Sequence, residues 1–367
     1  MFRIRLLCVL SCLLWATSCK TPCPCPEPPA ATATDGPTAP QVPDTSIAPS
    51  APDRPPGAFA TGAQPTRLRV TNQCTEPIWL QYAVGSGPSD QGNVLGPQQI
   101  RLQPGESHDY PVPPGRLEAT RFWPKTGCDA AGLNCKIGMS SPPCPATGCM
   151  PPIESKFEAT FAATDCANEG YRCMTYWNAS QVDGYTLPIS VFPKGPGVQP
   201  PGTPGIEQCV ESRCDALDLL QCPSNERSGK RTLDLRVFAP NDRSKLVGCL
   251  SPCKAHNYPP PFGLGLPEND EHGLMLCCPE GVTPEECRKG PVASTQYVQY
   301  INKVCPNVYA YSYDDRVGLH KCPATTQYEV VFCGGTGSGP TATILPKSTP
   351  KPRPGPAQRR HPATSNP

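Results

Sequence analysis

Cysteine is the residue type in this chain that could support the most chemistry. The chain has 367 residues, and 23 of them are cysteine. Thiols at this density either bind metal or form disulfides, and disulfides persist in an oxidising compartment. A zinc site usually shows paired C-x2-C units or nearby histidines, and neither accompanies Cys249, Cys253 or the adjacent Cys277 and Cys278. We therefore expect disulfides and no metal, and we exclude a reduced cytosolic enzyme.

Eighteen of the cysteines lie within residues 67–333, and this even number is compatible with nine disulfides. Spacing alone does not decide which of these cysteines pair. Of the remaining five, Cys23 and Cys25 are separated by a single residue. They can pair with each other only under strain, so we expect them to stay free or to link two chains.

Other kinds of chemistry are not indicated. The five histidines are scattered, and no H-E-x-x-H or G-x-S-x-G motif is present. The 32 basic and 31 acidic residues give a net charge of +1, which is too weak a field for a nucleic-acid partner. We expect no cofactor. The remaining candidates for chemistry are carboxylates, which the fold must bring together.

The elements expected between residues 67 and 333 are mainly strands, because apolar and polar residues alternate and turn signals follow each run. Helical periodicity is confined to Cys214–Cys222 and Ser294–Cys305. We expect a β-sandwich in the first two-thirds of this segment, followed by loops and short helices held by disulfides. The expected strands are Leu68–Asn72, Pro77–Leu80, Ser107–Val112, Leu117–Trp123, Phe157–Ala162 and Leu187–Phe192.

Residues 1–18 are typical of an export signal: Arg3 and Arg5 precede the apolar run Leu6–Trp15, which is too short to span a bilayer. The small residues 16–18 before Cys19 resemble a bacterial lipobox, in which that cysteine is acylated, although alanine stands where leucine is usual. Lipidation of Cys19 predicts an outer-membrane or cell-surface lipoprotein that contacts the membrane. The alternative, ordinary cleavage after residue 18, predicts a secreted or periplasmic protein.

Two further segments have the composition of disordered chains. Residues 19–66 follow the signal, and 13 of the 47 residues in Lys20–Thr66 are proline, which favours an extended spacer. The tail, residues 334–367, carries five lysines and arginines and no acidic residue. It either contacts an anionic cell envelope or is a solvated end.

The segment 67–333 resembles the thaumatin-like proteins, also known as the pathogenesis-related 5 family. The matching motifs are Val70–Cys74, Phe122–Cys128, Phe157–Phe161, Val182–Pro188, the pair Cys277-Cys278, Tyr309–Asp315 and Tyr328–Cys333. The resemblance implies a mainly β protein, with a flattened thaumatin-like β-sandwich and a disulfide-rich domain of loops and short helices. We expect a monomer.

The resemblance also implies eight disulfides. These are Cys74–Cys333, Cys128–Cys135, Cys144–Cys149, Cys209–Cys322, Cys214–Cys305, Cys222–Cys249, Cys253–Cys277 and Cys278–Cys287. Cys166 and Cys173 are left over and are expected to form a ninth. The span from Cys253 to Cys277 is longer than in plant relatives and holds an aromatic and proline-rich loop, Tyr258–Gly263. This loop either lines a ligand surface or has no role in binding.

Members of this family have a cleft lined by an arginine, a glutamate and three aspartates. By position, the glutamate corresponds to Glu158 and two of the aspartates to Asp183 and Asp314. Lys125 stands at the arginine position and keeps the charge without the bidentate fork. Asn178 stands at the third aspartate position and keeps hydrogen bonding without charge. The resemblance therefore implies an acidic interdomain cleft.

This cleft suggests two functions. In the first, it binds a polysaccharide of the β-1,3-glucan type, and Tyr185 or Tyr313 stacks on sugar faces. In the second, the protein is a weak endo-β-1,3-glucanase with Glu158 as the acid and Asp183 as its partner. Asn178 lacks the like charge that would raise the pKa of the acid, so we favour binding. A third alternative is a structural or defence protein whose cleft has no activity.

Overall fold

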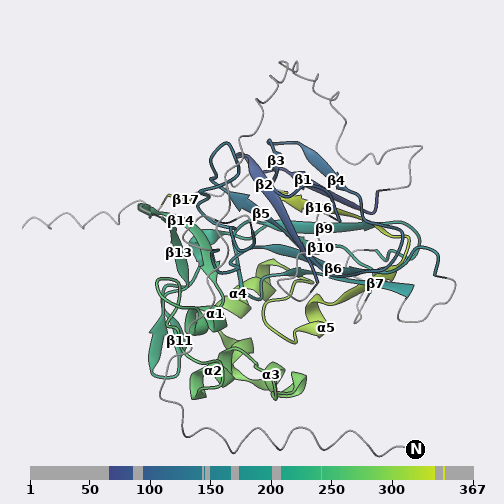
Figure 1. Ribbon diagram of the computed structural model, residues 1–367. Coiled ribbons are helices and arrows are strands. Elements are labelled where there is room, and N and C mark those ends of the chain that lie inside the picture. The colour runs from purple at the N-terminus through teal and green to yellow at the C-terminus, as the bar shows by residue number, and fades with distance from the viewer. Residues whose placement is uncertain are drawn as a thin grey trace, which may run out of the picture. The chain divides into compact units, whose positions relative to one another are not determined.

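The computed structural model describes residues 66–85, 94–142, 144, 149–166, 173–200, 208–240 and 242–334, and the backbone of Ala342–Thr343 (Figure 1). The expected export signal, Cys19, Cys23, Cys25 and the spacer lie outside the described residues, as does most of the tail. Within the described ranges, no helix has the length and apolar character that crossing a membrane requires.

Two sheets pack against each other as a β-sandwich. The five-stranded sheet has the order β10-β9-β16-β1-β4, and the six-stranded sheet has the order β15-β7-β6-β5-β2-β3. The first contains β1 (Leu68–Asn72), β4 (Ser107–Tyr110), β9 (Ile189–Lys194), β10 (Ser212–Cys214) and β16 (Gln327–Phe332). The second contains β2 (Ile78–Val84), β3 (Ile100–Leu102), β5 (Leu117–Thr126), β6 (Lys156–Phe161), β7 (Met174–Ser180) and β15 (His320–Pro323).

Aromatic side chains fill the space between the two sheets. The ring of Phe157 from β6 lies 5.8 Å from that of Tyr328 on β16, and the ring of Phe161 lies 6.0 Å from it. Both phenylalanines are completely buried. Because alternate residues of a strand point to opposite faces, β6 buries Phe157 and Phe161 and turns Glu158 and Thr160 outward. The core thereby fixes the face on which the polar residues of this sheet lie.

The rest of the chain forms smaller sheets and short helices. The small sheets contain the hairpin of β11 (Glu226–Ser228) and β12 (Arg231–Leu233), and β14 (Asp242–Leu250) paired with β8 (Gly184–Tyr185), β13 (Arg236–Ala239) and β17 (Ala342–Thr343). The helices are α1 (Pro252–Asn257), α2 (Glu271–Leu276), α3 (Pro284–Lys289), α4 (Gln296–Val304) and α5 (Asp315–Gly318), with 3-10 turns at Leu219–Gln221 and Pro291–Ser294. Side chains cap the first four helices, as Thr283 and Glu286 do reciprocally at α3.

Nine disulfides hold the described residues together, and their pairs are the eight that the resemblance implies and the leftover pair Cys166–Cys173. Cys74–Cys333 joins residues 259 positions apart. Cross-linking so long a loop restricts the unfolded chain and in the entropic account stabilises the fold by several kcal/mol. Donor atoms of Cys253, Glu268 and Cys277 lie within 4.8 Å of one another, but both sulfurs belong to one disulfide and are not thiolate ligands. This number of disulfides is typical of an extracellular protein.

The mainly β class is confirmed, and the expected strand Leu68–Asn72 coincides with β1. The expected helix Ser294–Cys305 is α4. The expected helix Cys214–Cys222 is wrong, because Cys214 ends β10 in pairing with Ile189 and only a 3-10 turn follows, capped by Asp218. Strands also continue past the first two-thirds, since β16 lies between β9 and β1 in the centre of its sheet.

Candidate functional site

Three neighbouring hollows form one groove beside the six-stranded sheet. The sheet hollow, of about 340 Å³, is lined by Arg121, Glu158, Tyr176 and Asn178 among others. The central hollow, of about 230 Å³, shares Glu158 and Asn178 with it and adds Asp183, Tyr309 and Ser312. The helix hollow, of about 250 Å³, shares Val182 and Ser312 with the central one. Shared residues join the three hollows into a continuous surface, which we call the groove.

A row of polar side chains crosses the sheet side of the groove. Arg121 on β5 is paired in register with Glu158 on β6, and Glu158 is paired with Asn178 on β7. Residues paired in this way point to the same face. The side chains of Arg121 and Glu158 form no ion pair or hydrogen bond with another described residue, and Asn178 Oδ1 is buried without a hydrogen-bond partner there. A guanidinium, a carboxylate and an amide therefore lie side by side and are available to bind a ligand.

Arg121 corrects the expectation for Lys125. Both residues lie on β5, but Lys125 is completely buried and its Nζ donates to Gln99 Oε1 at 2.7 Å and to the Gly132 carbonyl at 2.6 Å. Burial lowers the pKa of Lys125 to about 8. The loop around Gly132 covers this end of β5, so Lys125 does not line the groove. Arg121 supplies the cation beside Glu158, and its guanidinium retains the bidentate fork.

Asp183 lies in the groove but is held by two ammonium groups. Lys156, which is 3% exposed, forms an ion pair with one carboxylate oxygen, and Lys254 Nζ lies 3.4 Å from the other. Burial alone raises the pKa of Asp183, but Lys156 and Lys254 outweigh it, and the pKa is lowered. The carboxylate stays ionised, and its charge is compensated within the protein. The groove is therefore less acidic than three free carboxylates would make it.

Asp314 does not line the groove. It is 3% exposed, and burial raises its pKa to about 7. Its carboxylate lies near the Ala310 amide, which donates at 3.5 Å, so its place is within the turn before α5. Of the five expected residues, the structure brings Glu158, Asn178 and Asp183 together in the groove and places Lys125 and Asp314 outside it.

The aromatic residues of the groove also differ from those expected. Tyr185 is completely buried and its ring stacks 5.7 Å from that of Tyr297, so it is not available to a sugar. Tyr313 is not one of the described residues that line the three hollows. Tyr176 lines the sheet hollow and Tyr311 lines the helix hollow. Trp177 also lines the sheet hollow and Tyr309 the central one, so aromatic residues border all three hollows.

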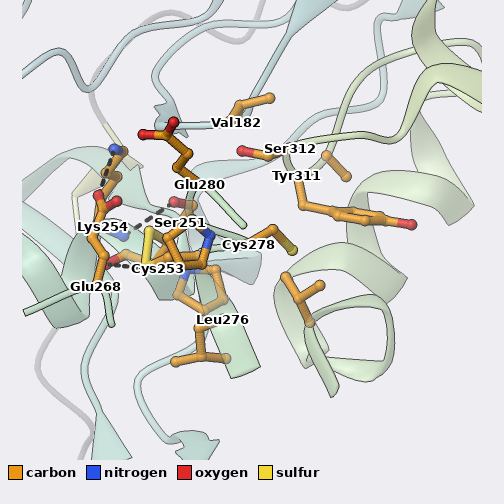
Figure 2. Close-up of a pocket in the computed structure, with 15 residues that line it drawn as sticks. Val182, Ser251, Cys253, Lys254, Glu268, Leu276, Cys278, Glu280, Tyr311 and Ser312 are labelled. Carbon is orange, nitrogen blue, oxygen red and sulfur yellow. Dashed lines mark hydrogen bonds and ion pairs between the residues drawn. A yellow bond between two sulfur atoms is a disulfide. The ribbon is translucent and has the colours of Figure 1, made fainter. Parts of the chain in front are cut away.

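Figure 2 shows the helix hollow, with Lys254 and Glu268 on one side and Tyr311 on the other. Lys254 links the hollow to the expected aromatic and proline-rich loop, because its Nζ lies 5.2 Å from the centre of the Tyr258 ring. It also lies 3.9 Å from a Glu268 carboxylate oxygen. The loop residue Tyr258 does not line the hollow. It positions Lys254, which in turn holds Asp183.

Glu154 is a buried carboxyl group beneath the groove that the sequence did not indicate. It is completely buried, and apart from the Ser140 hydroxyl, which favours its ionised form, no described residue donates a hydrogen bond to it. Burial raises its pKa to about 7, although the nearby Lys156 opposes this. For Lys156, the charges of Asp183, Glu158 and Glu154 outweigh burial, and its pKa is raised. Glu154 is therefore the third carboxyl group, with Asp183 and Glu158, whose charge acts on the buried Lys156.

Comparisons with known proteins identify a family for most of the described segment. The profile of the Thaumatin family matches residues 72–334. A protein named thaumatin-like protein 1a from Malus domestica is 30% identical over 281 residues, covering 75% of this chain and 93% of its own.

Two further relatives are of the same kind. A protein from Prunus avium named glucan endo-1,3-beta-glucosidase is 29% identical over 282 residues, covering 74% of this chain and 92% of its own. Pathogenesis-related protein 5 from Arabidopsis thaliana is 27% identical over 273 residues, covering 73% and 90% respectively.

Proposed function

Because the chain belongs to the thaumatin family, a family of defence proteins, we propose that its groove binds a polysaccharide of the β-1,3-glucan type. The observation that carries this proposal is the row of Arg121, Glu158 and Asn178, whose polar groups have no partners among the described residues. A guanidinium donates hydrogen bonds, a carboxylate accepts them and an amide does both. Sugar hydroxyls both donate and accept, so they match this mixed row.

Charge compensation in the sheet and central hollows also favours a neutral ligand. Arg121 and Glu158 carry opposite charges, and Asp183 is paired with Lys156 and Lys254. Tyr176 and Tyr311 add aromatic surface at the two ends of the groove. A few polar groups placed among apolar surfaces are the usual composition of a site that binds a small molecule or a chain segment. An uncharged glucan segment fits this composition.

The test is retention of the full chain on insoluble β-1,3-glucan. The double variant Arg121→Gln/Glu158→Gln removes both charges of the row and leaves the net charge unchanged. The matched control is Glu285→Gln/Lys289→Gln, which removes an ion pair whose side chains are 70% and 75% exposed on α3. We expect the wild type and the control to be retained and the double variant to lose at least about tenfold in affinity, or about 1.4 kcal/mol. Equal retention of all three proteins, or no retention of the wild type, would refute the proposal.

A second candidate is weak hydrolysis of β-1,3-glucan, favoured by the name of the Prunus avium relative, glucan endo-1,3-beta-glucosidase. Glu158 would then protonate the leaving oxygen and Asp183 would act as nucleophile or base. The ion pairs of Asp183 with Lys156 and Lys254 reduce its basicity, so the geometry supports binding better. Hydrolysis predicts that reducing ends are released from a soluble β-1,3-glucan and that Glu158→Gln abolishes the release. Unchanged release by that variant would eliminate the assignment.

We also propose that Cys19 carries a lipid and attaches the chain to a membrane. The support is the sequence of residues 16–19 and the proline-rich spacer after it, both outside the described residues. Replacing Cys19 by serine is expected to move the protein from the membrane fraction to the soluble fraction. An unchanged distribution would show that the lipid is not the attachment.

A further inference from the structure

The hairpin β11–β12 carries three exposed cations that line none of the three hollows of the groove. Arg227, Lys230 and Arg231 are all exposed within five consecutive residues. In the part of the chain that the structure describes, no ion pair joins any of the three to a carboxylate. Neighbouring Arg236 and Lys245, by contrast, are paired with Asp234 and Asp242. The hairpin therefore presents concentrated positive charge that the protein itself does not use.

A small hollow of about 150 Å³ lies beside this hairpin, between it, α2 and the start of α4. We call it the hairpin hollow. Arg227, Ser228 and Gly229 line it from the hairpin, Met275 from α2, and Ser294 and Thr295 from the segment before α4. Pockets for drug-sized ligands usually exceed roughly 300 Å³. The hairpin hollow is therefore of a size for one compact group rather than a chain of sugars.

Ser228 is an independent sign that the hairpin hollow takes a ligand. Its side chain is 4% exposed, and its Oγ has no hydrogen-bond partner among the described residues. A buried hydroxyl without a partner is destabilising, because it has lost its hydrogen bonds to water and gained none in the protein. Ser228 is paired in register with Arg231, so these two side chains start from the same face of the hairpin. An unpaired hydroxyl and an unpaired guanidinium are thus placed together.

Gly229 keeps the hairpin in this place. It has φ of +60°, which favours glycine, and a Cβ there would lie 2.5 Å from His272 Cε1. A larger residue would push the tip of the hairpin away from α2. Glycine at position 229 therefore allows the hairpin to approach α2 closely, and this close approach forms one side of the hollow.

One carboxylate also lines the hairpin hollow. Glu226 is 2% exposed, and its oxygens already accept from the Tyr297 amide at 2.9 Å and the Arg227 amide at 3.1 Å. Its charge is thereby bound to the backbone at the start of α4. Of the three cations only Arg227 lines the hollow, where Glu226 balances its charge, and the exposed Lys230 and Arg231 add positive charge beside the hollow.

We propose that hairpin β11–β12 and the hairpin hollow form a second binding site, which takes a phosphate group of an anionic polymer or lipid. Arg227 and Ser228, which line the hollow, would donate to the phosphate oxygens, and the exposed Lys230 and Arg231 would add positive charge beside it. Guanidinium groups suit phosphate because they bind two oxygens at once. Free polyphosphate and a lipid headgroup share this chemistry, so the experiment must distinguish the two sources.

The experiment is a calorimetric titration of the full chain with inorganic polyphosphate. The variant Arg227→Gln/Lys230→Gln/Arg231→Gln is compared with Lys289→Gln/Lys303→Gln/Arg316→Gln, which removes the same net charge from exposed cations elsewhere. We expect the hairpin variant to lose at least about tenfold in affinity and the control to lose much less. Ser228→Ala is expected to lose about fivefold, as one neutral hydrogen bond would contribute. Thermal unfolding of each variant checks that it is folded.

A second arm sediments the same proteins with phosphatidylglycerol vesicles and with phosphatidylcholine vesicles. Binding to phosphatidylglycerol alone, with the same order of variants, supports the site and identifies a lipid headgroup as the source. Binding to polyphosphate without vesicle binding supports the site and identifies a soluble polymer. Absence of binding to both probes, or an equal loss in the hairpin and control variants, overturns the proposal.

Discussion

Replacing Glu154 by glutamine is expected to stabilise the protein at pH 8 and to leave its stability nearly unchanged at pH 4.5. Glu154 is completely buried, and the Ser140 hydroxyl is the one described group that donates to it. Burial raises its pKa from 4.5 to about 7. Glutamine has a similar shape and no charge, so it mimics the protonated carboxyl at every pH.

The direction of the pH effect follows from proton binding. Between pH 4.5 and 7 the native protein keeps a proton on Glu154 that the unfolded chain has lost, so the stability of the wild type falls as the pH rises. The loss is complete above pH 7. A pKa difference from 4.5 to about 7 corresponds to about 3 kcal/mol at about 1.36 kcal/mol per pH unit. At pH 8 the variant should therefore be about 3 kcal/mol more stable than the wild type.

The assay is denaturant unfolding of both proteins at pH 4.5 and pH 8 without reductant. Other titrating groups such as Asp314 affect both proteins equally, so they cancel in the difference. The control, Glu285→Gln on an exposed site, should change stability by about 0.5 kcal/mol or less at both pH values. A Glu154→Gln effect that is the same at both pH values, or a variant less stable at pH 8, would refute the reasoning.

Two further substitutions test the contacts beneath the groove. Lys156→Met leaves the carboxylate of Asp183 without its buried partner and should cost about 3–5 kcal/mol of unfolding free energy at pH 8; a double-mutant cycle with Asp183→Asn should recover part of this loss, and strict additivity would contradict the coupling. Tyr297→Phe removes a buried hydroxyl that donates to the Gln181 carbonyl at 2.5 Å and should cost about 1–2 kcal/mol in the same measurement, whereas no loss would show that this hydrogen bond is not stabilising.

Much of the fold was predictable because short-range patterns express it. The alternation of Leu68–Asn72 predicted β1, and the spacing of Tyr297 and Ile301 predicted α4. The order of the cysteines, read through the family resemblance, gave eight of the nine disulfide pairs, and the two cysteines left over gave the ninth. The helix expected at Cys214–Cys222 failed because its apolar spacing also suits a strand end followed by a tight turn. Local spacing does not distinguish a helix from this arrangement, because the pairing of Cys214 with Ile189 and its disulfide to Cys305 fix the backbone there.

The candidate site was only partly predictable. Strand periodicity predicts on which face of a sheet a side chain lies, but it does not predict which other segment covers that face. Arg121 and Lys125 are four residues apart on β5 and have the same parity, yet the loop at Gly132 buries only Lys125. Likewise, Lys156 and Glu158 are two residues apart on β6, and their different roles depend on Asp183, which lies far along the chain. When segments far along the chain bury a polar side chain, the residues next to it in the sequence do not predict that burial.

Calorimetric titration of the full chain with a soluble β-1,3-glucan oligosaccharide tests most directly whether the groove binds glucan. We predict saturable binding that Arg121→Gln/Glu158→Gln weakens by at least about tenfold and that Glu285→Gln/Lys289→Gln leaves intact. Absence of binding by the wild type, or equal affinity of the wild type and the groove variant, would contradict it.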